Sequence, residues 1–186
     1  METVTQTNEP VPKQETEQKK KQKSPMNPIQ VFLLNLLIVI ISVWLLFGFV
    51  LGFAIAPNGD MAPSIHEHDL LLYYRLDKDW VAQDVVLIHK NNLTYVGRIV
   101  AVQNDTVEIT DANKLVINGN SMLESNIYFE TPRYEGFVDY PVKLKQNEYF
   151  VLADMRNGGK DSRYFGVVNA NEIQGTIITV IRRNNI

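Results

Sequence analysis

The longest apolar stretch of the chain lies near its N-terminal end. From Ile29 to Ala56, 28 consecutive positions carry no charged side chain. About 20 apolar residues in a helix cross the hydrocarbon core of a bilayer, so this stretch predicts one transmembrane helix over residues 29–56. Ala54-Ile55-Ala56 resembles a signal-peptide cleavage site, but the run is longer than the roughly 7–15 apolar residues of a signal peptide. Pro57 follows directly and, with its fixed φ and missing N–H, suits a protease cleft poorly. The pattern therefore indicates an uncleaved signal anchor.

Beyond this stretch, the pattern changes to short runs of β-branched and aromatic residues. Such runs are typical of strands, and they cover 70–74, 85–88, 94–102, 106–109, 115–117, 149–152 and 176–181. Turn signals separate them at residues 103–105 and 118–120, where the Asn118-Gly119 pair suits a tight turn. Residues 57–186 are therefore predicted to form one all-β domain of twisted antiparallel sheets. The segment 122–147 is less regular and predicts loops or a smaller β subdomain.

Charge sets the expected orientation and excludes one class of function. Residues 1–28 are polar without apolar periodicity, which predicts a disordered tail. The lysine cluster at 19–23 places this tail in the cytoplasm and the β domain outside the cell membrane. Of the 18 basic and 21 acidic side chains, five and four lie in the tail, which leaves residues 57–186 with a net charge of −4. That domain lacks the basic balance of a nucleic-acid-binding protein.

Metal and cofactor chemistry finds little support in the composition. The chain has no cysteine, which excludes disulfides and thiolate metal sites. His66, His68 and His89 are scattered, and two imidazoles on one strand face do not define a metal site. We therefore expect no metal and no cofactor.

Three short motifs occur in the order of the active-site boxes of one enzyme family. They are Asn58-Gly59-Asp60-Met61-Ala62-Pro63-Ser64, then Tyr95-Val96-Gly97-Arg98, then Ala153-Asp154-Met155-Arg156 with Asp161-Ser162-Arg163-Tyr164-Phe165-Gly166. Together they resemble the bacterial type I signal peptidases, whose pattern places a nucleophilic serine before Met-x-Pro, a lysine base before Arg, and a Gly-Asp-Asn-Arg…Ser-x-Asp-Ser-Arg box last. Three boxes in order are specific where one would not be. The resemblance covers roughly residues 50–186 and implies the same all-β fold.

The residues that carry the family's chemistry differ in every box. The resemblance places Asp60 at the serine, Gly97 at the lysine and Gly159 at the serine that orients the lysine. A serine–lysine hydrolase needs a hydroxyl that attacks and a neutral amine that takes its proton. Asp60 is a weaker nucleophile, and Gly97 has no side chain. Asn58 stands where some members carry an oxyanion-hole hydroxyl, and its amide can still donate. We therefore expect no peptidase activity.

Neighbouring cations do not replace the missing base. Strand alternation puts Tyr95 and Gly97 on one face and Arg98 on the other, and a guanidinium does not deprotonate in proteins. Lys160, the nearest lysine within the motifs, is expected in a solvated loop.

Two groups of motif residues receive other roles from the resemblance. The residues expected to line a peptide cleft are Asn58, Gly59, Met61, Pro63 and Tyr95. Asp161, Ser162 and Arg163 keep the family's pattern and are expected to brace the wall behind that cleft through a buried Asp–Arg pair.

Signal-peptidase-like proteins without the serine–lysine dyad accompany pilin and sortase proteins in Gram-positive bacteria, and the resemblance implies such a role here. We expect a single-pass membrane protein that assists pilus assembly without catalysis, in a chaperone-like manner, by binding pilin subunits or the pilus-specific sortase. The family cleft takes an extended peptide by strand addition, and without a nucleophile it would release that peptide intact. Two alternatives remain open. One is an active peptidase in which Asp60 works with a second carboxyl, Asp154 or Asp161. The other is a regulatory subunit of a genuine signal peptidase.

Overall fold

The computed structural model describes residues 26–124, 127 and 129–182. The predicted disordered tail, residues 1–28, lies almost entirely outside these described residues. Contacts divide the chain into two units, residues 1–39 and 40–186, and the β structure belongs to the second unit.

The apolar stretch forms a helix, but not over its whole length. Helix α1 spans Pro28–Leu45 and continues as a π-helical turn, η1, over Leu46–Val50. These 23 residues are long and apolar enough to cross a membrane, and at 1.5 Å per residue they extend about 35 Å. The chain then forms strand β1, Leu51–Ile55, instead of continuing the predicted helix to residue 56. Apolar content alone did not reveal this change, because Leu51–Ile55 suits a buried helix and a strand equally well.

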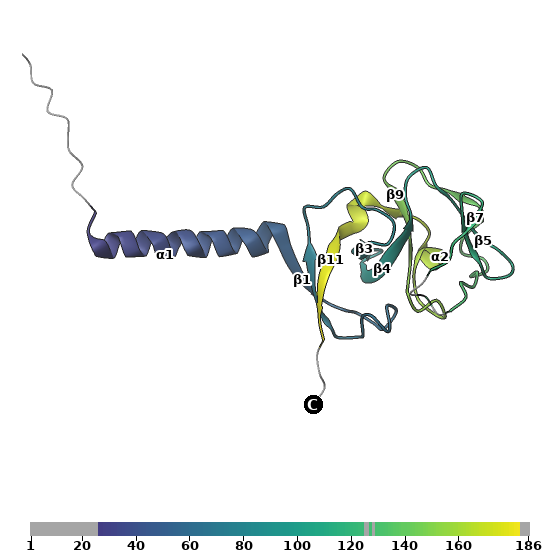
Figure 1. The fold of residues 1–186 in the computed structure, drawn as a ribbon, viewed down its shortest axis with the longest axis horizontal. Coiled ribbons are helices and arrows are strands. Elements are labelled where there is room, and N and C mark those ends of the chain that lie inside the picture. Colours follow the sequence, from purple (N-terminus) through teal and green to yellow (C-terminus); the bar gives the residue numbers. More distant parts are fainter. Residues whose placement is uncertain (1–25, 125–126, 128, 183–186) are drawn as a thin grey trace, which may run out of the picture. The chain divides into compact units, whose positions relative to one another are not determined.

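The β domain contains two antiparallel sheets (Figure 1). The larger has the order β1-β2-β11-β3-β4-β9-β10, and the smaller has the order β7-β6-β5-β8. The further strands of the larger sheet are β2 (Leu70–Tyr74), β3 (Val85–Lys90), β4 (Leu93–Ala101), β9 (Glu148–Leu152), β10 (Val168–Asn169) and β11 (Ile173–Ile181). Those of the smaller sheet are β5 (Thr106–Ile109), β6 (Leu115–Ile117), β7 (Asn120–Ser121) and β8 (Val142–Lys143). Two short helices, α2 (Ser162–Phe165) and η2 (Ala170–Glu172), lie between β9 and β11. The nine strand pairings found among the described residues are all antiparallel, which confirms the predicted all-β antiparallel fold.

Side-chain alternation along β3 and β4 builds a core on each face of the larger sheet. Ile88 and Ile99 belong to one buried cluster, which also contains Val151 of β9. Leu87, one position from Ile88, and Val96, three positions from Ile99, belong to a second cluster on the opposite face. A third cluster joins the ends of β4 and β9 to the smaller sheet. Strand β4 therefore crosses the centre of the domain.

The predicted turn at Asn118-Gly119 joins β6 to β7. Both residues have positive φ, 53° and 81°, which is the requirement of a type I′ hairpin turn. Asn and Gly are the residues that tolerate this conformation, so the sequence determines this turn.

Candidate functional site

Asp60 lies in a loop that follows β1, at the position of the family's serine. Its carboxylate accepts a hydrogen bond from the Asn58 amide (Nδ2 to Oδ2, 2.9 Å), and its backbone N–H donates to Asn58 Oδ1 at 3.2 Å. Both ends of the Asn58 amide are therefore bound to Asp60. An oxyanion hole needs N–H donors that point at the reacting group. Here the Asn58 amide donates to Asp60, and the Asp60 N–H donates to Asn58.

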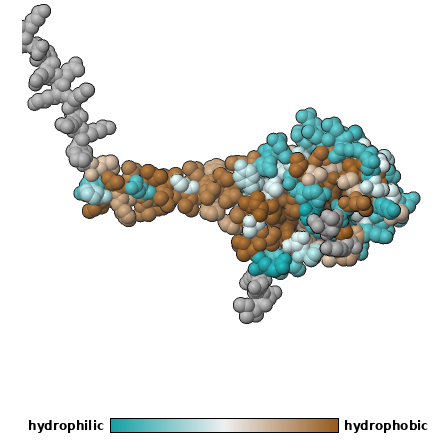
Figure 2. Space-filling view, in the orientation of Figure 1, coloured by the Kyte–Doolittle hydropathy of each residue, from teal (hydrophilic) through white to brown (hydrophobic). Residues whose placement is uncertain are grey.

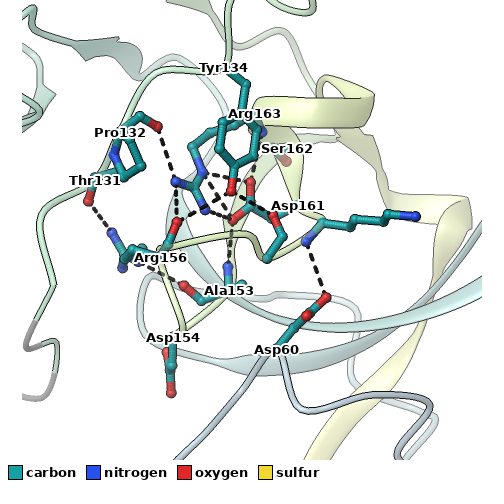
Figure 3. Close-up of polar contacts among 12 residues, drawn as sticks. Asp60, Thr131, Pro132, Tyr134, Ala153, Asp154, Arg156, Asp161, Ser162 and Arg163 are labelled. Carbon is teal, nitrogen blue, oxygen red and sulfur yellow. Dashed lines mark hydrogen bonds and ion pairs between the residues drawn. The ribbon is translucent and has the colours of Figure 1, made fainter.

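The same aspartate joins two segments that are far apart in the sequence. The backbone N–H of Lys160 donates to Asp60 Oδ2 at 3.1 Å. The backbone N–H of Met155 donates to the Asp60 carbonyl at 2.9 Å. Figure 3 shows Asp60 at the edge of the polar network of the last motif. Asp60 thus connects the first motif to the loop of the third.

The surroundings of Asp60 disfavour its charge. Partial burial raises the pKa of its carboxyl above the ordinary 3.8, and the nearby negative charge of Asp161 acts in the same direction. The hydrogen bonds from Lys160 and Asn58 oppose this shift without cancelling it. The group is a partly desolvated carboxylate held by amide donors.

At the lysine position, the space that a side chain would need is occupied. Gly97 is buried on β4 and lies opposite Val86 of β3. A Cβ at this position would lie 2.5 Å from Cγ1 of Val151. Ordinary contacts of a Cβ begin near 3.4 Å. Even alanine therefore does not fit at residue 97 unless Val151 moves.

Gly159, at the position of the orienting serine, is closed in the same way. A Cβ there would lie 2.6 Å from Cβ of Ala153 and 2.7 Å from the carbonyl oxygen of Met155. The second neighbour is backbone and has little freedom to shift. At both glycines an added Cβ therefore requires a neighbouring atom to shift.

The two cations considered as substitutes for the base, Arg98 and Lys160, have side chains that contact other groups. Arg98 forms a two-pronged ion pair with Asp154, through Nε to Oδ1 at 2.9 Å and Nη2 to Oδ2 at 2.7 Å. Lys160 is exposed, and its Nζ lies 5.8 Å from the centre of the Tyr164 ring. Only the backbone N–H of Lys160 reaches Asp60.

The buried pair predicted behind the site is present. Arg163 and Asp161 have side chains 0% and 2% exposed, and Nη2 of Arg163 lies 2.7 Å from Oδ2 of Asp161. Asp161 Oδ2 also accepts from the Ala153 N–H, and Ser162 Oγ accepts from the Val151 N–H, both at 2.9 Å. These three motif residues therefore fix the backbone at the start of the last box.

A second buried guanidinium was not foreseen. Arg156 is fully buried and donates to the Ala153 carbonyl, to Thr131 Oγ1 and to Glu124 Oε1, at 2.8, 2.7 and 2.6 Å. Thr131 and Glu124 belong to the irregular segment 122–147, which carries no periodic signal. The motif pointed to Arg156, but nothing in the sequence pointed to its partners.

The arginines also account for both carboxyls that an aspartic-type site would require. Asp154 is bound by Arg98, and Asp161 by Arg163. A carboxyl dyad shares one proton between two nearby oxygens, but here each of these carboxylates is held by a guanidinium. This geometry disfavours the dyad.

The predicted cleft residues divide into two groups. Met61 is 1% exposed, and its sulfur accepts the Asp154 N–H at 3.4 Å. Tyr95 is 6% exposed and packs on Phe165, with ring centres 4.8 Å apart. The prediction that these two line an open cleft is wrong, because both side chains point into the core.

The other three predicted cleft residues reach the surface. Asn58 and Gly59 are half-buried, and Pro63 is exposed.

A pocket of about 340 Å³ lies elsewhere, beside Leu115, Met122 and Phe129, and none of its lining residues belongs to the three motifs. Within residues 26–124, 127 and 129–182, no group of three or more His, Asp or Glu side chains is arranged to hold a metal ion.

The chain matches one known protein family. The family model described as "Signal peptidase, peptidase S26" matches residues 29–181, and the chain belongs to this family. The chain is 27% identical over 153 residues to signal peptidase I S of Bacillus subtilis (strain 168), which covers 76% of this chain and 82% of that protein.

Other relatives give a similar picture. Signal peptidase I of Bacillus licheniformis is 27% identical over 175 residues, which covers 87% of this chain and 91% of that protein. Among solved structures, a signal peptidase I from Enterococcus faecalis V583 is 24% identical and aligns with a TM-score of 0.46, over 54% of this chain and 97% of that chain.

Proposed function

We propose that this protein is a signal-peptidase-like protein without peptidase activity, which assists pilus assembly at the membrane by holding an extended segment of a pilin or of the pilus-specific sortase. The pilus role comes from the resemblance of the degenerate motifs, and the proposed lack of activity rests on the geometry around Asp60 and Gly97. The relatives named above are called signal peptidases. The proposal is that this chain differs from them in lacking peptidase activity.

One observation carries the proposed loss of activity. Hydrolysis by this family's mechanism needs an amine beside the nucleophile, and the position of that amine is Gly97. Cγ1 of Val151 lies 2.5 Å from where its Cβ would be. Val151 is packed into the space that the side chain of the base would need. This packing supports the proposed inactivity, because it leaves no room for a group that transfers a proton.

The nucleophile position supports the same proposal. Asp60 is engaged through its carboxylate, its N–H and its carbonyl. A group with these contacts connects two loops, and it has neither a hydroxyl to activate nor a free oxyanion donor beside it.

Strand β1 offers a means of holding a peptide. It is the terminal strand of the larger sheet and pairs only with β2 among the described strands. Its second edge therefore presents unpaired backbone groups, to which an extended segment can add as a further strand. Phe53, on this strand, is 52% exposed. The strand follows the membrane helix directly and leads into the Asn58–Asp60 loop.

The test of activity uses the full chain in detergent with a preprotein that carries an Ala-x-Ala site. A genuine signal peptidase in the same detergent serves as the positive control. We expect no cleavage by the wild-type chain. Cleavage at a defined site that is lost in Asp60→Asn would refute the proposed inactivity.

The test of peptide holding places a photo-crosslinking amino acid at Phe53 in cells that produce pilin. We expect crosslinks to pilin or to the sortase, which mass spectrometry would identify. Leu93 is a matched control, because it is 55% exposed but lies at the start of β4. Equal crosslinking from both positions would contradict specific binding at β1.

The assembly role itself is tested by gene deletion. We expect monomeric pilin to be made and exported while polymerised pili are lost. Normal high-molecular-weight pilin ladders on an immunoblot of the deletion strain would refute the assembly role, whatever the result of the cleavage assay.

A further inference from the structure

Arg75 lies at the end of the membrane helix. It follows β2 directly, and its backbone N–H donates to the carbonyl of Val50 at 2.9 Å. Val50 is the last residue of the helix that begins at Pro28. Because the helix is about 35 Å long and a bilayer core is about 30 Å thick, its last turn reaches the headgroup region. Arg75 is placed at that depth.

Among the described residues, the guanidinium of Arg75 has no anionic partner. Its Nε is buried and has no hydrogen-bond acceptor, and none of the ion pairs within the described residues involves Arg75. Its Cζ lies 5.2 Å from the centre of the Tyr73 ring. A buried donor without an acceptor is costly and rare in native proteins. Neither Nη atom of Arg75 is among the buried unpaired atoms, so the Nη edge of the guanidinium is the part that an acceptor from outside the described residues can reach.

The charged side chains of the loop after Arg75 do not provide an acceptor for its guanidinium. Asp77 accepts from the Asp79 N–H at 3.2 Å and from the Thr176 hydroxyl at 3.3 Å. Lys78 lies over the ring of Trp80, 5.4 Å from its centre. No acidic side chain of this loop contacts the guanidinium.

The surroundings of the helix end are those of a membrane interface. Trp44 packs edge-on against Phe49, and Phe47 stacks on Phe53, with ring centres 5.7 and 5.6 Å apart. All four rings remain more than 40% exposed, and Figure 2 shows the apolar surface of the helix. Aromatic rings gather at the headgroup level of membrane proteins, where phosphate is the abundant anion.

We propose that Arg75 binds the phosphate of a phospholipid in the leaflet that faces the β domain. A guanidinium matches two phosphate oxygens with a pair of N–H donors, and both the depth and the unpaired state of Arg75 fit this ligand. The inference rests on the helix crossing the membrane and is independent of the proposed pilus function. A purely structural role, in which Arg75 only balances the negative end of the helix, would affect stability but not lipid binding.

The experiment measures phosphatidylglycerol binding to the full chain in detergent by native mass spectrometry. We expect the lipid to bind Arg75→Gln about tenfold more weakly than wild type, since hydrogen bonds to charged groups are lost. Arg133→Gln is the matched control, because Arg133 pairs with exposed Asp111 in the β domain, and it should bind as wild type does. Equal lipid binding by Arg75→Gln and wild type would overturn the proposal.

Two further arms make the result decisive. Arg75→Lys keeps the charge but not the paired donors and should show an intermediate loss; if Arg75→Gln does not fold, unchanged lipid binding by Arg75→Lys would overturn the proposal. Inorganic phosphate alone should not shift the thermal midpoint of wild type. A shift that depends on Arg75 would assign the site to free phosphate and overturn the lipid as its ligand.

Discussion

Replacement of Gly97 by alanine tests whether the core has filled the space of the family's base. The new Cβ would lie 2.5 Å from Cγ1 of Val151, about 1 Å inside the ordinary contact distance of 3.4 Å. Both residues are buried on adjacent strands, so neither side chain can turn into solvent. Overpacking of this kind costs about 1–3 kcal/mol. For a domain of this size, that loss lowers the thermal midpoint by roughly 4–12 °C.

The assay is thermal unfolding of the full chain in detergent, followed by near-ultraviolet circular dichroism. Gly59→Ala is the matched control, because a Cβ at Gly59 meets no atom within 4 Å. Val151→Ala should relieve the overlap, so the double variant Gly97→Ala/Val151→Ala should lose less stability than the two single variants predict together. A coupling of about 0.5–3 kcal/mol is expected for side chains in contact. Additive effects, or a Gly97→Ala variant as stable as Gly59→Ala, would refute the reasoning.

Three further predictions follow from the same site. Asp60→Ser/Gly97→Lys should not cleave a preprotein, because Val151 fills the space of the lysine; detectable cleavage would show that the core repacks readily. Arg163→Ala leaves Asp161 buried without its cation and should destabilise the fold by about 3–5 kcal/mol, whereas Arg133→Ala, at an exposed pair, should change stability by less than about 0.5 kcal/mol; similar melting curves would contradict the role of Arg163. Because the pKa of Asp60 is raised in the fold, the proton that it retains stabilises the fold below pH 3.8, and this contribution is lost as the pH rises through the folded pKa. Wild type should therefore lose stability relative to Asp60→Asn over that rise, and parallel pH profiles of the two thermal midpoints would exclude the shift.

Local signals predicted two of the four described strands of the smaller sheet, β5 and β6. The predicted strands 106–109 and 115–117 match β5 and β6 residue for residue, because β-branched runs there are bounded by residues that demand a turn. The positive φ of Asn118 and Gly119 was predictable for the same reason. Sequence was least informative where a segment was apolar throughout. Strand β1 was therefore assigned to the membrane helix, although five residues of β2 pair with it.

The candidate site shows a different limit. The motifs identified Asp60 and Gly97 as positions without the expected chemistry, and Asp161 and Arg163 as a pair. They did not predict that Val151 fills the space beside Gly97, since that contact joins β4 to β9 across 54 positions of sequence. They also placed Met61 in an open cleft, whereas the loop turns its side chain into the core beside Asp154. Contacts between distant segments, and not local preference, decided these points.

The two buried guanidiniums affect how the domain opens locally. Arg156 holds Glu124 and Thr131, and Arg163 holds the carbonyl of Pro132. Detaching this irregular segment would remove the Glu124, Thr131 and Pro132 acceptors and leave both guanidiniums only partly satisfied, so it should not open independently of the larger sheet. The amide protons of Val151 and Ala153, which are bound by Ser162 and Asp161, should therefore exchange with solvent only at the rate of global unfolding.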